Sequence, residues 1–246
     1  MVRKILQPFY TAYASSSFVI SLFLAFPFIL LVGLFDNTKA RRAIWTLLQW
    51  MAYYWLFIIG MPVTKKGPRP DKNKKYVYIA NHISYIDTVV IFPAIPSYFR
   101  PLGKIEMKRI PLFGFIYKQI VLLVDRSSTH SRAKSMRLMW RALRYGNIAI
   151  FPEGTFNETE PYLKDFYDGA FRLAVNAQTP ILPMIFADTV DRWHYSAWWK
   201  IWPGRNRVIY LDPVPVAGLK AEDIPALKEK VHALMTEAMK NAKATA

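Results

Sequence analysis

The sequence predicts an α/β fold: a mixed, mostly parallel sheet flanked by helices, with an N-terminal membrane-associated two-helix hairpin. Three observations lead to this class. From Tyr76 onward, short apolar runs of strand length alternate with helical patterns. Before Val63 the chain has two long apolar stretches that are rich in aromatic residues. A length of 246 residues suits one α/β domain with an appendage.

Residues 1–63 are predicted to form the membrane-associated hairpin. Its apolar segments are Phe18–Phe35 and Ala43–Val63, each only marginally long for a membrane span of about 20 residues. A signal peptide fits poorly, because no small-residue cleavage site follows the first segment. Two true spans would place positive charge on both sides of the membrane, against the positive-inside rule. We therefore expect a hairpin that enters one leaflet, with two spans or a buried soluble hairpin as alternatives.

Tryptophan side chains should mark the membrane depth of this hairpin, because aromatic residues favour the interface between lipid and water. We expect Trp45, Trp50 and Trp55 at that interface. A second group of tryptophans, between Trp193 and Trp202, lies either at the interface or in the protein core.

A basic linker is predicted over residues 64–75, followed by an α/β domain over residues 76–246. Runs of strand length within or bordering this domain are Tyr76–Ala80, Val121–Val124, Ile148–Phe151, Ile181–Phe186 and Arg207–Leu211. Helical spacing predicts helices over Ser131–Tyr145 and Gly169–Ala177, and a last helix with the apolar stripe Ile224, Leu227, Val231, Leu234 and Ala238.

Composition narrows the possible partners. A net charge of +16 points to an acidic partner, and 53% hydrophobic residues favour an anionic membrane surface over nucleic acid. We therefore expect a membrane partner and no nucleic acid. The chain has no cysteine, which excludes a disulfide scaffold, a thiolate metal site and a cysteine nucleophile. Its four histidines are scattered, so we expect no metal site.

Polar residues directly follow the predicted strand Tyr76–Ala80. Sites in α/β sheets form at the carboxyl ends of strands, and His82 stands in such a place. Asp87, five residues later, could fold back onto the His82 ring, fix its tautomer and leave the other ring nitrogen as a general base. The competing interpretation is a surface histidine beside an aspartate that caps a helix.

A second polar turn, Phe151–Thr155, follows another predicted strand and is expected to face the first turn. Glu153 and the Gly154 backbone could hydrogen-bond a polyol or a head group, although Pro-Glu-Gly also forms ordinary turns. Cations between the two turns, including Lys104 and Arg126, could bind phosphate or a thioester oxyanion. The alternative for these cations is a solvated basic face.

These segments, in this order, resemble the four blocks of the lysophospholipid acyltransferase family, over roughly Tyr76 to Asp188. The matching residues are Asn81–Asp87, which resembles the His-x₄-Asp motif; Lys104, Glu106, Pro111 and Gly114 with Asp125-Arg126; Phe151–Thr155; and Thr179–Pro183. The apolar hairpin is also similar to that of bacterial members.

The resemblance implies transfer of a fatty acyl group from acyl-CoA or acyl carrier protein to the free hydroxyl of a lysolipid. The expected acceptor is 1-acyl-sn-glycerol-3-phosphate (lysophosphatidic acid), and the product is phosphatidic acid. The attack is direct, with His82 as base and Asp87 orienting it, and uses no bound cofactor. The implied substrate-binding residues are Asn81, Lys104, Arg126, Phe151, Pro152, Glu153, Gly154 and Thr155. The implied location is the cytoplasmic face of a bacterial inner membrane, without crossing it.

Two departures from the family pattern bear on the acceptor. Phe156 stands where the family usually has arginine, and Tyr167-Asp168 stand where a basic residue usually precedes Gly169-Ala170. An acyltransferase for a lysolipid without a terminal phosphate, such as a lyso-aminolipid, is therefore an alternative. A lipase or esterase would need a Gly-x-Ser-x-Gly elbow, which the sequence lacks. A non-catalytic basic membrane-binding protein would explain the charge but not the histidine–aspartate pair.

Overall fold

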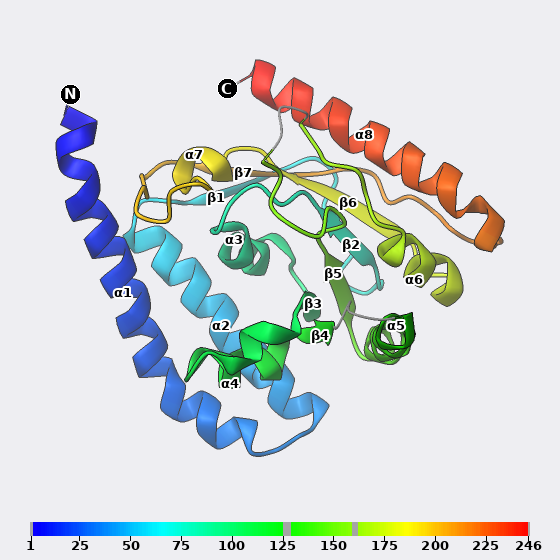
Figure 1. Ribbon diagram of the computed structural model, residues 1–246, viewed down its shortest axis with the longest axis horizontal. Helices are drawn as coiled ribbons and strands as arrows, with labels where there is room; N and C mark the ends of the chain where they lie inside the picture. Colours follow the sequence, from blue (N-terminus) through cyan, green and yellow to red (C-terminus); the bar gives the residue numbers. More distant parts are fainter. Residues whose placement is uncertain (1, 125–128, 159–161, 246) are drawn as a thin grey trace.

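A seven-stranded sheet forms the centre of the molecule (Figure 1). The computed structural model describes residues 2–124, 129–158 and 162–245. The strand order is β1-β7-β6-β2-β5-β3-β4, and every neighbouring pair is parallel except β6 with β7. This confirms the mixed, mostly parallel sheet. The strands are β1 (Val63–Lys66), β2 (Val77–Ala80), β3 (Phe99–Lys104), β4 (Leu122–Val124), β5 (Asn147–Ile150), β6 (Ile181–Phe186) and β7 (Asn206–Tyr210).

Helices cover both faces of the sheet, as the alternating sequence pattern predicts. They are α1 (Val2–Gly33), α2 (Thr38–Ile58), α3 (Asp87–Ala94), α4 (Phe113–Ile120), α5 (Thr129–Leu143), α6 (Gly169–Ala177), α7 (Thr189–Arg192) and α8 (Ile224–Ala244), with 3-10 turns η1 (Ile105–Arg109) and η2 (Ala221–Asp223). One apolar core packs helices α1, α2, α3 and α4 against one face of the sheet. A second core joins α5, α6 and α8 to the other face, and Figure 1 shows the two groups on opposite sides.

The N-terminal hairpin is built into the first of these cores. Helix α2 turns a stripe of buried residues towards the sheet and α1, as expected for apolar residues three and four positions apart. Trp45 and Trp55 belong to that stripe, with 6% and 2% of their surface exposed, so the expectation that they lie at a membrane interface is wrong. The Trp55 indole donates to the carbonyl of Ala14 in α1 at 3.2 Å. Trp50, on the opposite side of α2, is 70% exposed.

Helix α1 carries most of the exposed apolar surface of the hairpin. Of the helices in the described ranges, it is the one long and apolar enough to cross a membrane. Its large exposed side chains include Phe9, Ile20, Phe23, Leu24 and Leu31. The turn between the helices stays against the rest of the protein: the Arg42 guanidinium donates to the Tyr145 carbonyl at 2.6 Å, and the Gln119 amide donates to the Gly33 carbonyl at 3.3 Å.

Two strands lie where the sequence pattern gave no strand. β1 takes up the first three residues of the predicted linker, Thr64, Lys65 and Lys66, and pairs with β7 at one edge of the sheet. β3 has the sequence Phe-Arg-Pro-Leu-Gly-Lys, which interrupts any apolar run with charge, proline and glycine. Both strands are specified by their pairing partners rather than by their own composition.

Candidate active site

The residues predicted to do chemistry lie at the carboxyl ends of β2 and β5, which are neighbours in the sheet. The first residue after β2, Asn81, is fully buried and holds the following segment in place. Its side-chain oxygen accepts from the Phe186 backbone N–H at 2.7 Å, and its side-chain nitrogen donates to the Phe186 carbonyl at 3.1 Å. Asn81 therefore ties the ends of β2 and β6 together, and its contact with a substrate stays a prediction.

His82 and Asp87 are brought together as the sequence predicts. The His82 Nδ1 atom lies 3.0 Å from Asp87 Oδ2. The same oxygen accepts the backbone N–H groups of Ile83 and Ser84, each at 2.8 Å. Asp87 is fully buried in the first turn of α3, where the helix dipole favours a negative charge. Because an ionised carboxylate only accepts hydrogen bonds, it places the ring proton on Nδ1 and leaves Nε2 as the basic nitrogen.

Glu153 holds the His82 segment and the second polar turn in register. One carboxylate oxygen accepts the His82 backbone N–H at 2.8 Å, and the other accepts the Lys164 backbone N–H at 2.9 Å. Burial raises the pKa of Glu153 to about 7, although both backbone hydrogen bonds and the nearby His82 act to lower it. Gly154 follows with a φ of +74°, a conformation that glycine adopts without steric cost.

Two aromatic rings lie against the His82 imidazole, and two more lie beyond one of them. The Phe151 ring stacks on the imidazole with centroids 4.2 Å apart and an angle of 17° between planes. The Phe156 ring lies 4.3 Å from the imidazole, tilted by 51°. Tyr85 contacts Phe156 and Trp193, with ring centroids 4.8 and 5.4 Å away. The His82 imidazole is therefore flanked by apolar rings. One of them belongs to Phe156, the position at which the family pattern usually has arginine.

Lys164 brings a positive charge to the same place from another part of the chain. Its ammonium group donates to the Thr155 hydroxyl at 3.2 Å and to the Phe156 carbonyl at 3.4 Å. The backbone of Lys164 is held by Glu153, so the cation is anchored to the His82 segment through one carboxylate. Thr155 itself is exposed. Lys164 is half-buried and is the candidate cation that lies against Phe156.

The other predicted substrate-binding residues are placed less closely. Lys104 ends β3, two strands from β2, and its exposed side chain forms no ion pair within the described ranges. Arg126 lies outside the described residues. Pro152 is buried, and its carbonyl accepts the Tyr167 backbone N–H at 2.9 Å. Asp168 pairs with Lys228 at 2.8 Å rather than contacting His82. In the part of the chain that the structure describes, no cluster of acidic and histidine side chains could hold a metal ion.

A segment near Trp193 closes one side of the site and was not expected there. The Ser84 hydroxyl donates to the Trp193 carbonyl, and Ser84 forms a β-bridge with His194. Behind this segment, a cavity of about 1030 Å³ opens against the first turns of α1; its lining includes Arg3, Lys4, Gln7, Thr11, His194, Trp198, Trp199 and Lys200. Tyr85 and Trp193 were missed as wall residues, because an aromatic residue in a sequence gives no sign of which loop it will meet.

Comparison with known proteins agrees with this geometry. Residues 62–187 match the model of the Acyltransferase family. The 1-acyl-sn-glycerol-3-phosphate acyltransferase alpha of Ovis aries is 30% identical over 195 residues, which cover 77% of this chain and 67% of that protein. The 1-acyl-sn-glycerol-3-phosphate acyltransferase of Haemophilus influenzae is 28% identical over 184 residues, covering 72% of this chain and 74% of that protein.

The fold has a solved counterpart as well. The crystal structure of the 1-acyl-sn-glycerophosphate (LPA) acyltransferase PlsC from Thermotoga maritima matches with a TM-score of 0.75 at 21% identity, covering 99% of this chain and 97% of that one. The matched family region contains the His82–Asp87 pair and the Phe151–Thr155 turn. From its sequence match and its fold, the chain belongs to the lysophospholipid acyltransferase family and is an acyltransferase.

Proposed function

We propose that this enzyme transfers a fatty acyl group from a thioester donor, acyl-CoA or acyl carrier protein, to the free hydroxyl of 1-acyl-sn-glycerol-3-phosphate. The observation that carries the proposal is the buried Asp87 carboxylate 3.0 Å from the His82 ring nitrogen, at the edge of the sheet. The names of the sheep and Haemophilus influenzae relatives support this acceptor.

In the proposed reaction, His82 Nε2 takes the proton of the acceptor hydroxyl while its oxygen attacks the thioester carbonyl carbon. Asp87 stabilises the imidazolium that forms. The tetrahedral intermediate then breaks the carbon–sulfur bond, and the imidazolium returns its proton to the departing thiolate. The products are the new ester and the free thiol, and the reaction needs no bound cofactor or metal.

The acceptor phosphate is proposed to bind the ammonium group of Lys164. A cation there compensates for Phe156, since Lys164 donates to the backbone of that very residue at 3.4 Å. Hydrogen bonds that involve charged groups contribute about 1.5–3 kcal/mol each. The ring of Phe156 then packs against the apolar part of the acceptor or donor, beside the base.

The enzyme is proposed to act at the cytoplasmic face of a bacterial inner membrane without crossing it. The exposed apolar side of α1 provides the contact with lipid, together with exposed aromatic residues of α2 such as Trp50 and Phe57, while the other side of α2 packs in the protein core. A helix with one apolar side exposed is suited to lie in the membrane interface.

The test is an acyl-transfer assay with a panel of lysolipids and both donor types. Wild-type enzyme should acylate lysophosphatidic acid, and His82→Ala should retain less than about a tenth of that turnover, since general base catalysis contributes on the order of 10²–10⁴. Lys164→Met should raise the KM for lysophosphatidic acid about tenfold or more and leave the KM for a monoacylglycerol acceptor unchanged. An equal rise in KM for both acceptors would show that Lys164 does not bind the phosphate.

The second candidate acceptor is a lysolipid without a terminal phosphate, such as a lyso-aminolipid. Phe156 favours it, because an aromatic ring 4.3 Å from the base makes that side of the site apolar. Turnover of a lyso-aminolipid at least about ten times more efficient than that of lysophosphatidic acid would establish this acceptor instead.

A further inference from the structure

Helix α5 presents an exposed face on which four cations form no ion pair within the described residues. Lys134, Arg137, Arg141 and Arg144 are all exposed along and just beyond the helix. The sequence of α5 contains no aspartate or glutamate. None of these four cations takes part in the ion pairs found within the described ranges. This basic face is therefore a concentrated part of the net charge of +16.

The spacing of these cations along α5 produces like-charge repulsion that destabilises the helix. Within α5, Arg137 lies three residues after Lys134 and four residues before Arg141. Like charges at these spacings are neighbours on a helix surface and destabilise it. The helix is held instead by its buried side, where Met139 and Leu143 enter the core. An anionic partner on the basic face would relieve the repulsion.

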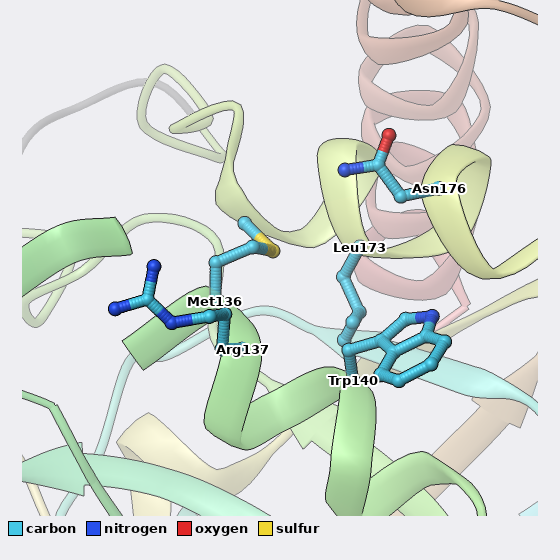
Figure 2. A pocket seen from close by; sticks show the side chains of 5 residues that line it. All are labelled: Met136, Arg137, Trp140, Leu173 and Asn176. Atoms are coloured by element: carbon cyan, nitrogen blue, oxygen red, sulfur yellow. The ribbon is translucent and has the colours of Figure 1, made fainter. Parts of the chain in front are cut away.

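The shape of this face points to a protein rather than to a small anionic molecule. The hollow beside it, lined by Met136, Arg137, Trp140, Leu173 and Asn176, has a volume of about 250 Å³ (Figure 2). Small-molecule pockets are typically concave spaces of about 300–1,000 Å³ with converging polar groups. Here the cations spread along a convex helix, with the Arg144 guanidinium 4.0 Å from the centre of the exposed Trp140 ring. Charged rims around an exposed aromatic residue are typical of protein interfaces.

Helix α5 begins at the edge of the sheet that carries the site and packs on the other face of the sheet from α1. It follows β4, whose carboxyl end lies at the same edge of the sheet as those of β2 and β5. The first turns of α5 therefore start from the edge that carries His82 and Glu153. Its core contacts lie on the opposite face of the sheet from α1, as Figure 1 shows, so a membrane against α1 does not cover the basic face.

We propose that the basic face of α5 is the docking surface for an acidic carrier protein that delivers the acyl thioester. The proposal rests on the proposed function, because it identifies the surface through which one of the two donor types reaches the site. Positive charge on α5 speeds the encounter with an acidic protein by electrostatic steering. A coenzyme A donor does not need this surface.

The experiment compares one acyl chain carried by acyl carrier protein with the same chain carried by coenzyme A, using lysophosphatidic acid as acceptor. The variant Arg137→Glu/Arg141→Glu reverses the charge on α5. The matched control Lys230→Glu/Lys240→Glu makes the same charge change at exposed positions of α8. With the carrier protein as donor, kcat/KM of the α5 variant should fall at least about 30-fold. The fall should come from a higher KM for the carrier protein, with kcat little changed. With coenzyme A, and in the α8 control, kcat/KM should stay within about threefold.

Each other outcome overturns the docking surface. An equal fall with both donors, a fall with coenzyme A alone, or no fall at all would each show that α5 does not receive a carrier protein. Wild-type enzyme that accepts acyl-CoA but not the acyl carrier protein would also rule out this docking surface. If the α5 variant loses binding to vesicles of anionic lipid while the control keeps it, the partner is the membrane instead. Wild-type enzyme that uses neither donor would contradict the proposed function itself.

Discussion

Replacing Asp87 with asparagine tests how the carboxylate supports the base. Asp87 Oδ2 accepts two backbone N–H groups as well as the His82 ring nitrogen. An asparagine must place its oxygen, not its NH₂ group, against those two backbone donors. Its oxygen then still accepts from His82 Nδ1, so the Asp87→Asn enzyme should keep the productive tautomer and lose only the negative charge.

The size of the loss follows from that charge. In the transition state the imidazolium and the carboxylate are about 4 Å apart, and two unit charges at this distance attract by about 4 kcal/mol at an effective dielectric constant of about 20. Losing most of this attraction slows turnover by about 10²–10³. An inverted tautomer would cost more, on the order of 10⁴ as in serine proteases.

The assay is kcat at saturating donor and acceptor, with nitrogen NMR of the His82 ring to report its tautomer. Asp212→Asn, an exposed position after β7, is the matched control and should leave kcat unchanged. A proton on Nε2 in the Asp87→Asn enzyme, or a loss beyond about 10⁴, would refute the argument that the backbone fixes the amide. A loss of less than tenfold would show that the charge of Asp87 contributes little.

Further predictions concern a buried acid, a buried ion pair and the membrane. Burial raises the pKa of Glu153 from 4.5 to about 7, so folding favours its protonated form and stability falls as the pH rises between these values. In urea unfolding, the free energy of unfolding of the wild-type enzyme should fall by about 3 kcal/mol between about pH 4 and pH 8, and Glu153→Gln should remove this fall. The same pH dependence of the unfolding free energy in the variant would contradict the prediction. Burial acts to raise the pKa of Asp188, but the hydrogen bonds and charge of Arg207 outweigh it and hold this pKa below its ordinary value. The stability from Asp188 is therefore present at neutral pH and is lost as the pH falls below about 4. Asp188→Ala should destabilise the fold by about 3–5 kcal/mol at pH 7; adding Arg207→Met should recover most of that, and no recovery would show that an unpaired charge is not the cause. A single cysteine at Phe35, exposed at the hairpin turn, should react with an impermeant label from the same side of a vesicle as one at Lys240. Labelling from the far side would establish a spanning hairpin.

The sequence was sufficient for the parts of the site that are local. His82 and Asp87 are five residues apart, and one turn after a strand brings them together. The Phe151–Thr155 turn was placed correctly beside them, because adjacent parallel strands end at the same edge. What could not be predicted is contact between distant segments: Glu153 holding the backbone of Lys164, and Trp193 closing the far wall.

The same distinction applies to the fold. Apolar runs identified β2 and β5 because both are buried on both faces. β1, with two lysines in four residues, has the composition of an edge strand, which charge protects from further pairing. The tryptophans of α2 show the limit of composition, since Trp45 and Trp50 differ only in which side of one helix they occupy.

The pairing of β1 with β7 has a consequence for how the chain is made. Val63 lies opposite Asn206, so the first strand to leave the ribosome waits for the last before it gains its hydrogen-bonded neighbour. Until then the core that includes α2 also lacks Val208 and Tyr210, the residues that β7 contributes to it. Such distant closure is slow and leaves apolar surface open during synthesis. Chains that stop short of Tyr210 should therefore aggregate, and a nearby bilayer can shelter the hairpin while the remaining strands are synthesised.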